Sequence, residues 1–92
     1  MPALKESYFH RGGTTALTGR TIPEHFAEIV GRFPDRPAVV SLHQKRSLSY
    51  TELAEEIDLL ARGLLGLGLG KGDRIGLWAT NHIEWLMVQM AT

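Results

Sequence analysis

A glycine-rich stretch at residues 66–73, with the sequence GLGLGKGD, is the first candidate for chemistry in this chain. Phosphate-binding loops place backbone N–H groups at the start of a helix, where the helix dipole favours an anion. Here the glycines follow a helical pattern and precede an apolar run, which is the reverse context. Neither G-x-G-x-x-G nor G-x-x-x-x-G-K-[ST] fits the spacing. The stretch therefore predicts a left-handed helix C-cap and a tight turn, with Lys71 and Asp73 in solvent.

The side chains that most often serve in metal sites and acid–base catalysis are scattered. No two of the four histidines have the separations that metal sites favour, and each is expected to be exposed: His10, His25, His43 and His82. The closely spaced carboxylates fall on the polar face of a predicted helix, where charges usually meet only water: Glu55, Glu56 and Asp58.

Serine and tryptophan offer no stronger signal. Ser41, Ser47 and Ser49 lack a G-x-S-x-G setting, and Ser49 has another role as a helix cap. Trp78 and Trp85 have no basic or aromatic interleaving around them, which favours packing over base stacking. The sequence thus predicts no catalytic, cofactor-binding or metal-binding residue within the chain.

The composition bounds the remaining function classes. Ninety-two residues suffice for one small domain, and 43% hydrophobic with 22% charged residues is typical of a globular protein. Ten basic residues balance ten acidic ones, which argues against nucleic-acid and acidic-membrane binding. The chain contains no cysteine, and its charged N-terminus does not resemble a signal peptide. No apolar run is long enough to span a membrane, so we expect a soluble, cytoplasmic protein.

The first elements along the chain have clear local signals. Residues 1–20 are polar and predict an extended arm. A Thr-x-x-Glu capping box at Thr21 and Glu24, with Pro23 in the first turn, predicts a helix that ends before Pro34. Residues 38–42 and 47–50 predict the two strands of a hairpin, joined by a polar turn.

A second capping box, at Ser49 and Glu52, opens the helix with the strongest amphipathic stripe in the sequence. Residues 74–79 then predict a buried strand, and Asn81 with Glu84 predicts the cap of a last helix. The order helix, hairpin, helix, strand, helix predicts an α/β fold with a right-handed βαβ unit. The last helix has no stop signal and the last strand lacks a second partner, which suggests a truncated chain with an incomplete sheet.

Three ordered stretches resemble the N-terminal segment of AMP-forming (adenylate-forming) acyl-CoA synthetases. Residues 21–40 are similar to the family's helix followed by F-P-D-R-P-A-V, and residues 48–53 to its L-T-Y-x-E-L. Residues 66–81 resemble its G-L-x-K-G-D-R-V-G-I-x-x-x-N. Residues 17–21 and 87–92 look most like medium-chain or short-chain fatty-acyl-CoA synthetases. The resemblance implies that residues 21–92 belong to an AMP-binding domain, truncated at its C-terminal end.

This resemblance implies a ligase that joins a carboxylic acid to ATP and then transfers the acyl group to coenzyme A, with Mg²⁺. The family's phosphate loop, adenylate motif, ribose-binding aspartate and C-terminal lysine have no counterpart here, so the segment is expected to be a non-catalytic scaffold that binds none of these cofactors. Its expected partner is the remainder of a synthetase chain. Two alternatives stay open: a short interaction or dimerisation module, and an unrelated small α/β domain. Acyl-chain preference and oligomeric state do not follow from the sequence.

Overall fold

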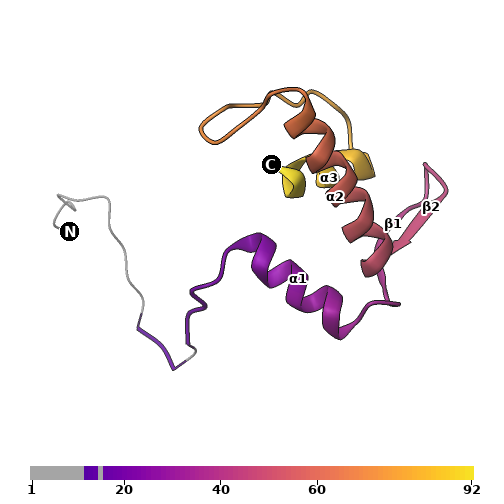
Figure 1. Ribbon diagram of the computed structural model, residues 1–92. Helices are drawn as coiled ribbons and strands as arrows, with labels where there is room; N and C mark the ends of the chain where they lie inside the picture. Colours follow the sequence, from indigo (N-terminus) through magenta and orange to yellow (C-terminus); the bar gives the residue numbers. More distant parts are fainter. Residues whose placement is uncertain (1–11, 15) are drawn as a thin grey trace, which may run out of the picture.

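The computed structural model describes residues 12–14 and 16–92 (Figure 1). This part of the chain contains α1 (Ile22–Arg32), β1 (Pro37–Ser41), β2 (Arg46–Ser49), α2 (Tyr50–Gly66) and α3 (Ile83–Ala91). The predicted arm lies largely outside the described residues, as does His10, and residues 16–20 form no regular element. None of the helices in the described part is both long and apolar enough to cross a membrane.

The predicted capping box of the first helix is confirmed. The Thr21 hydroxyl accepts a hydrogen bond from the Glu24 N–H at 3.3 Å, and the Glu24 carboxylate accepts one from the Thr21 N–H at 3.2 Å. No residue of α1 is buried; its Phe26 ring lies 6.4 Å from the Tyr50 ring at the start of α2. Its boundaries therefore come from local signals, while its tertiary contacts are few.

The predicted hairpin is also confirmed, with each strand shifted by one residue toward the N-terminus. β1 and β2 pair antiparallel, with Val40 opposite Ser47 and an irregularity between Pro37 and Val39. The Lys45 N–H donates to the Leu42 carbonyl at 3.2 Å and closes the turn. Lys45 has a φ of 54°, in the left-handed region that L-residues other than asparagine and aspartate rarely occupy.

The strand predicted at residues 74–79 is wrong. These residues are all described, and they form an irregular connection between α2 and α3. Ile75, Leu77 and Trp78 are exposed, Trp78 completely. A strand needs a neighbour to accept its backbone hydrogen bonds, and the sheet of the described residues consists of β1 and β2 alone. The predicted βαβ unit is therefore not formed, and what remains of the α/β architecture is a hairpin with helices.

The start of the last helix also differs from the prediction. Asn81 is not its cap: the N-cap position is His82, whose side chain makes no capping hydrogen bond. Instead the side-chain carbonyl of Gln44, in the hairpin turn, accepts a hydrogen bond from the Ile83 N–H at 2.9 Å. This backbone donor at the start of α3 is thus satisfied by a residue 39 positions earlier in the chain.

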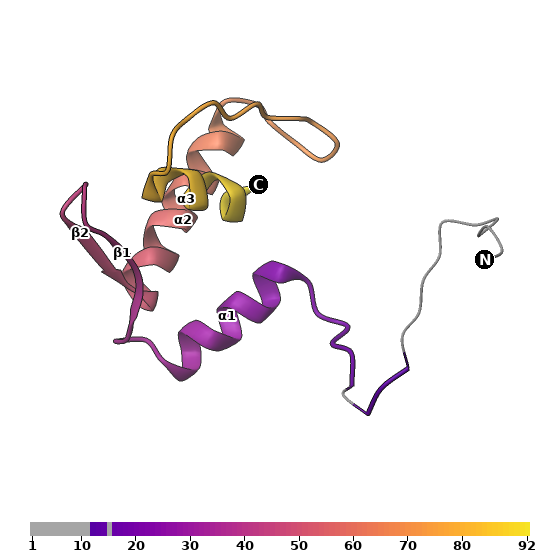
Figure 2. The same cartoon turned by 180° about the vertical axis from the view of Figure 1, so that it is seen from behind.

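The core joins the hairpin to α2 and α3. Its buried side chains are Leu48 of β2, Leu53 of α2, and Ile83 and Met87 of α3, while Phe26 of α1 packs against it half-buried. Figures 1 and 2 show α3 lying against α2, with α1 set to one side. Burial of only four side chains among the described residues is small for a chain of this length, so we expect marginal stability.

Candidate functional site

The glycine-rich stretch forms the C-terminal cap that its sequence predicts. Gly68, with a φ of +90°, donates its N–H to the Leu65 carbonyl at 3.0 Å, and Leu69 donates to the Leu64 carbonyl at 3.4 Å. With Leu67 as the C-cap residue, these two bonds are the pair that defines a Schellman motif. The glycine is needed at position 68 because a side chain would be strained at this φ.

A tight turn follows the cap. The Asp73 N–H donates to the Gly70 carbonyl at 3.1 Å, and the Asp73 carboxylate accepts the Gly70 N–H at 2.7 Å. Gly72, the third residue of this turn, has a φ of +91°, as a type II turn requires. The Gly70 N–H is therefore already hydrogen-bonded to the Asp73 carboxylate and is not available to bind a phosphate.

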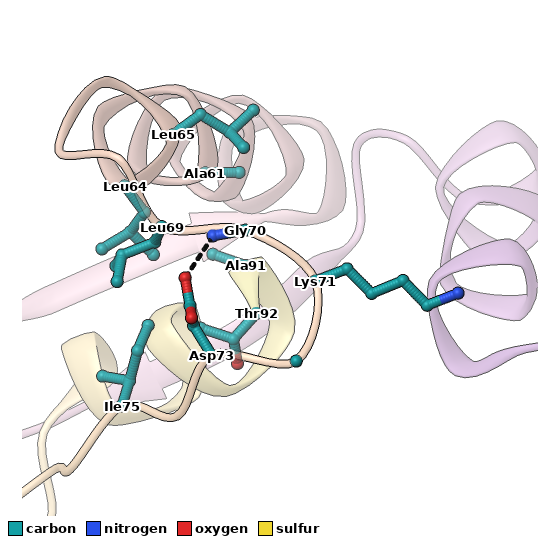
Figure 3. Close-up of a pocket in the computed structure, with 11 residues that line it drawn as sticks. Ala61, Leu64, Leu65, Leu69, Gly70, Lys71, Asp73, Ile75, Ala91 and Thr92 are labelled. Carbon is teal, nitrogen blue, oxygen red and sulfur yellow. Dashed lines mark hydrogen bonds between the residues drawn. The ribbon is translucent and has the colours of Figure 1, made fainter.

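A hollow of about 570 Å³ lies between this turn and the ends of α2 and α3 (Figure 3). Its walls are mostly apolar, and Asp73 contributes the carboxylate. The Lys71 side chain extends away from the other labelled residues in Figure 3, so its ammonium group does not face them. The hollow adjoins the C-terminal end of α2, where the helix dipole is negative. Its residues do not fit a nucleotide phosphate or a Mg²⁺–phosphate group.

The other candidates from the sequence have structural partners or lie in solvent. Ser49 caps α2: its hydroxyl accepts from the Glu52 N–H at 3.1 Å, and the Glu52 carboxylate accepts the Ser49 N–H at 3.0 Å. Both hydrogen bonds lower the pKa of Glu52, and the one from the Ser49 backbone N–H has the larger effect. Asp58 pairs with Arg62 at 2.9 Å, and His25 is exposed on α1. Ser47 lies on β2, and Glu55 and Glu56 are exposed on α2.

A polar cluster connects the hairpin turn to the start of α3. The Gln44 amide donates to the Glu84 carboxylate at 2.9 Å, and the Arg46 guanidinium lies 3.1 Å from it. The Gln44 hydrogen bond is the main cause that lowers the pKa of Glu84. This cluster was not predicted, because its members are about 40 positions apart in the sequence.

Two histidines that were expected to stand alone are brought together in the same region. The ring centres of His43, in the hairpin turn, and His82, before α3, lie 5.0 Å apart with the rings edge to face. The side chains of Ser41 and Thr80 contact one of these rings each. No group of three or more metal-ligating side chains occurs within the described residues.

Comparison with known proteins gives a consistent result. The family model described as "AMP-binding enzyme" matches residues 26–92. The chain is 42% identical to the mouse medium-chain acyl-CoA ligase ACSF2, mitochondrial, over 86 residues, which is 94% of this chain and 14% of that protein. It is 41% identical to the protein of the same name from Macaca fascicularis over 92 residues, 100% of this chain and 15% of that protein.

A bacterial protein is also similar to the chain over a short part of its own length. The putative acyl-CoA synthetase YngI of Bacillus subtilis is 38% identical over 76 residues, 83% of this chain and 14% of that protein. The chain thus spans about a seventh of the length of these relatives. No solved structure gives a significant match.

The prediction of a cytoplasmic protein is contradicted by this comparison, since the ACSF2 relatives are named as mitochondrial. The prediction used the absence of cysteine and of a signal peptide. Neither feature distinguishes one reducing compartment from another.

Proposed function

Because the chain belongs to the AMP-binding enzyme family, we propose that it is the N-terminal segment of a fatty-acid–CoA ligase. The complete enzyme would join a carboxylate to ATP, release pyrophosphate and form an acyl-adenylate. The thiol of coenzyme A would then attack the acyl carbonyl and displace AMP. The names of the ACSF2 relatives support a medium-chain acid as the substrate.

Within such an enzyme, we assign residues 21–92 the role of a scaffold. The observation that carries this assignment is the similarity of nearly the whole chain to acyl-CoA ligases, along a segment whose polar groups serve as caps and turns. Each of three side chains accepts a hydrogen bond from a backbone N–H group: Thr21, Ser49 and Asp73. We therefore attribute binding of ATP, Mg²⁺ and coenzyme A to other parts of the enzyme.

The first experiment is to determine the mass of the native polypeptide with an antibody against residues 21–92. We expect a product several times heavier than 10.2 kDa. A native product of 10.2 kDa would contradict the assignment of this chain to a longer ligase.

The second experiment incubates the 92-residue chain with ATP, Mg²⁺, coenzyme A and octanoate. We expect pyrophosphate release no faster than in a sample of the heat-denatured chain. Release that depends on octanoate and on the native chain would contradict the scaffold role.

A second candidate function is an interaction or dimerisation module. Large apolar side chains exposed on the connection between α2 and α3 and on α2 favour it: Leu59, Leu65, Leu67, Ile75, Leu77 and Trp78. Sedimentation velocity over a hundredfold range of concentration tests this function. A sedimentation coefficient that rises with concentration, and no longer rises in Trp78→Ser, would favour the module; a constant monomer value would reject self-association.

A further inference from the structure

The connection between α2 and α3 carries a strand pattern without a strand beside it. Residues 74–79 have the sequence RIGLWA, and their backbone groups make no hydrogen bond with any described residue. Ile75, Leu77 and Trp78 are exposed, although such side chains stabilise a strand when a neighbour packs beside them. Free backbone groups next to exposed apolar side chains are a template for pairing with another chain.

The sequence of this segment is complementary to itself. Two copies that run antiparallel can place Gly76 opposite Gly76, and each Ile75 then lies opposite Leu77. Each Arg74 lies opposite Trp78, on the other face of the ribbon, because directly opposite residues share a face. The first pair is apolar, and the second joins a guanidinium to an indole, which attract each other. Symmetric registers centred on Ile75 or Leu77 place glycine opposite arginine or tryptophan and lose these contacts.

A ribbon of two short strands is only marginally stable in water, so it needs an apolar surface to pack on. The chain provides one beside the segment. Ile75 lines the hollow at the end of α2 together with Leu65 and Leu69 (Figure 3). Leu67, the C-cap residue of α2, is also exposed. The formal net charge of the chain is zero, so overall repulsion does not oppose the association of two copies.

We propose that two copies of the chain associate through residues 74–78, which pair as antiparallel strands about a two-fold axis at Gly76. The contact is isologous, because the same residues serve on both copies. This inference gives the dimerisation module a defined interface, and it rests on that second candidate function and not on the ligase assignment.

Disulfide formation tests the register. The chain contains no cysteine, so Gly76→Cys introduces a single thiol. A Cβ at this glycine would meet no described heavy atom within 4 Å beyond its chain neighbours, and its φ is not positive, so the substitution should preserve the circular dichroism spectrum. In the proposed pair the two Cα atoms of residue 76 lie about 4.5–5.5 Å apart, which suits a disulfide.

Ala79→Cys is the matched control, because it lies three residues from the axis. Its two thiols would be about 20 Å apart in the proposed dimer. We expect Gly76→Cys to form a covalent dimer at least about tenfold faster than Ala79→Cys under the same oxidising conditions, since only the first holds its thiols close together.

Two charge variants separate strand pairing from general apolar contact. Ile75→Glu with Leu77→Lys and Ile75→Lys with Leu77→Lys remove the same apolar side chains. In the proposed register the first variant places a carboxylate opposite each ammonium, whereas the second places like charges opposite each other. Light scattering should show the unaltered chain approaching twice its 10.2 kDa mass as the concentration rises. The first variant should dimerise about tenfold more tightly than the second.

The outcomes distinguish this interface from the wider module. A mass of 10.2 kDa at every concentration over a hundredfold range would overturn both the interface and the dimerisation module. A mass that doubles, with equal rates of disulfide formation in Gly76→Cys and Ala79→Cys, would overturn the strand pairing and leave a dimer formed through other contacts. Equal dimerisation of the two charge variants would overturn the proposed register in the same way.

Discussion

The backbone of Lys45 is the least favourable local conformation in the hairpin. Its φ of 54° costs a non-glycine residue about 1 kcal/mol, and glycine adopts it freely. We therefore predict that Lys45→Gly raises the free energy of unfolding. The gain is at most about 1 kcal/mol, because glycine also increases the entropy of the unfolded chain, which opposes it. Urea denaturation followed by circular dichroism measures the change.

Lys71→Gly is the matched control, because Lys71 also lies in a turn but has no positive φ. It should destabilise the chain by about 0.5–1 kcal/mol, through the entropy of the unfolded state. Equal effects of the two substitutions would show that the conformation of Lys45 is not strained.

Two carboxyl groups should make the free energy of unfolding decrease at acidic pH. The pKa of Glu52 is lowered mainly by the Ser49 N–H, and the pKa of Glu84 mainly by the Gln44 amide. A carboxyl group with a lowered folded pKa stabilises the fold above its unfolded pKa, about 4.3 for glutamate. This contribution is lost as the pH falls through the folded pKa.

We therefore predict that the melting temperature decreases as the pH is lowered from about 4.3. Glu52→Gln keeps a side chain that can complete the capping box, but it does not titrate. Its melting temperature should depend less steeply on pH in this range. An unchanged slope would exclude Glu52 as a source of the acid sensitivity.

At the scale of the elements, the start of α3 depends on the hairpin turn. Gln44 caps the Ile83 N–H, and the His82 side chain makes no capping bond. We predict that Gln44→Ala costs about 1 kcal/mol and increases hydrogen exchange at the start of α3. The double variant with His82→Asn should recover most of the loss, because asparagine supplies a local cap. Failure of this rescue would mean that Gln44 acts mainly through Glu84.

The elements that the sequence predicts correctly are those with local signals. The capping boxes at Thr21 and Ser49 act over three residues, and the glycine cap at Gly68 acts over one turn. The errors come from interactions between distant residues. Residues 74–79 have an apolar strand pattern but no strand to pair with among the described residues. The N-cap of α3 is His82, one residue after the predicted Asn81, and Gln44 supplies the capping contact there. The His43–His82 contact joins positions that no local pattern links.

At the scale of the whole molecule, stability depends on a small core. Leu53, a residue of this core, is 2% exposed, whereas Leu59 on the same helix is 65% exposed. Leu53→Ala should cost about 2–5 kcal/mol, enough to abolish cooperative melting in a marginally stable chain. Leu59→Ala should change stability by less than about 0.5 kcal/mol. Similar effects of the two substitutions would show that the hairpin, α2 and α3 do not fold as one unit.

The position of Trp78 has an optical consequence. Its indole is fully exposed, whereas Trp85 is 41% exposed. The fluorescence of the chain should therefore be red-shifted and readily quenched by iodide, with Trp78 as the main quenchable component. Any molecule or longer stretch of polypeptide that covers this connection should shift the emission to shorter wavelength and protect it from the quencher. The chain thus carries an intrinsic optical probe of its own contacts, and no label has to be attached to detect them.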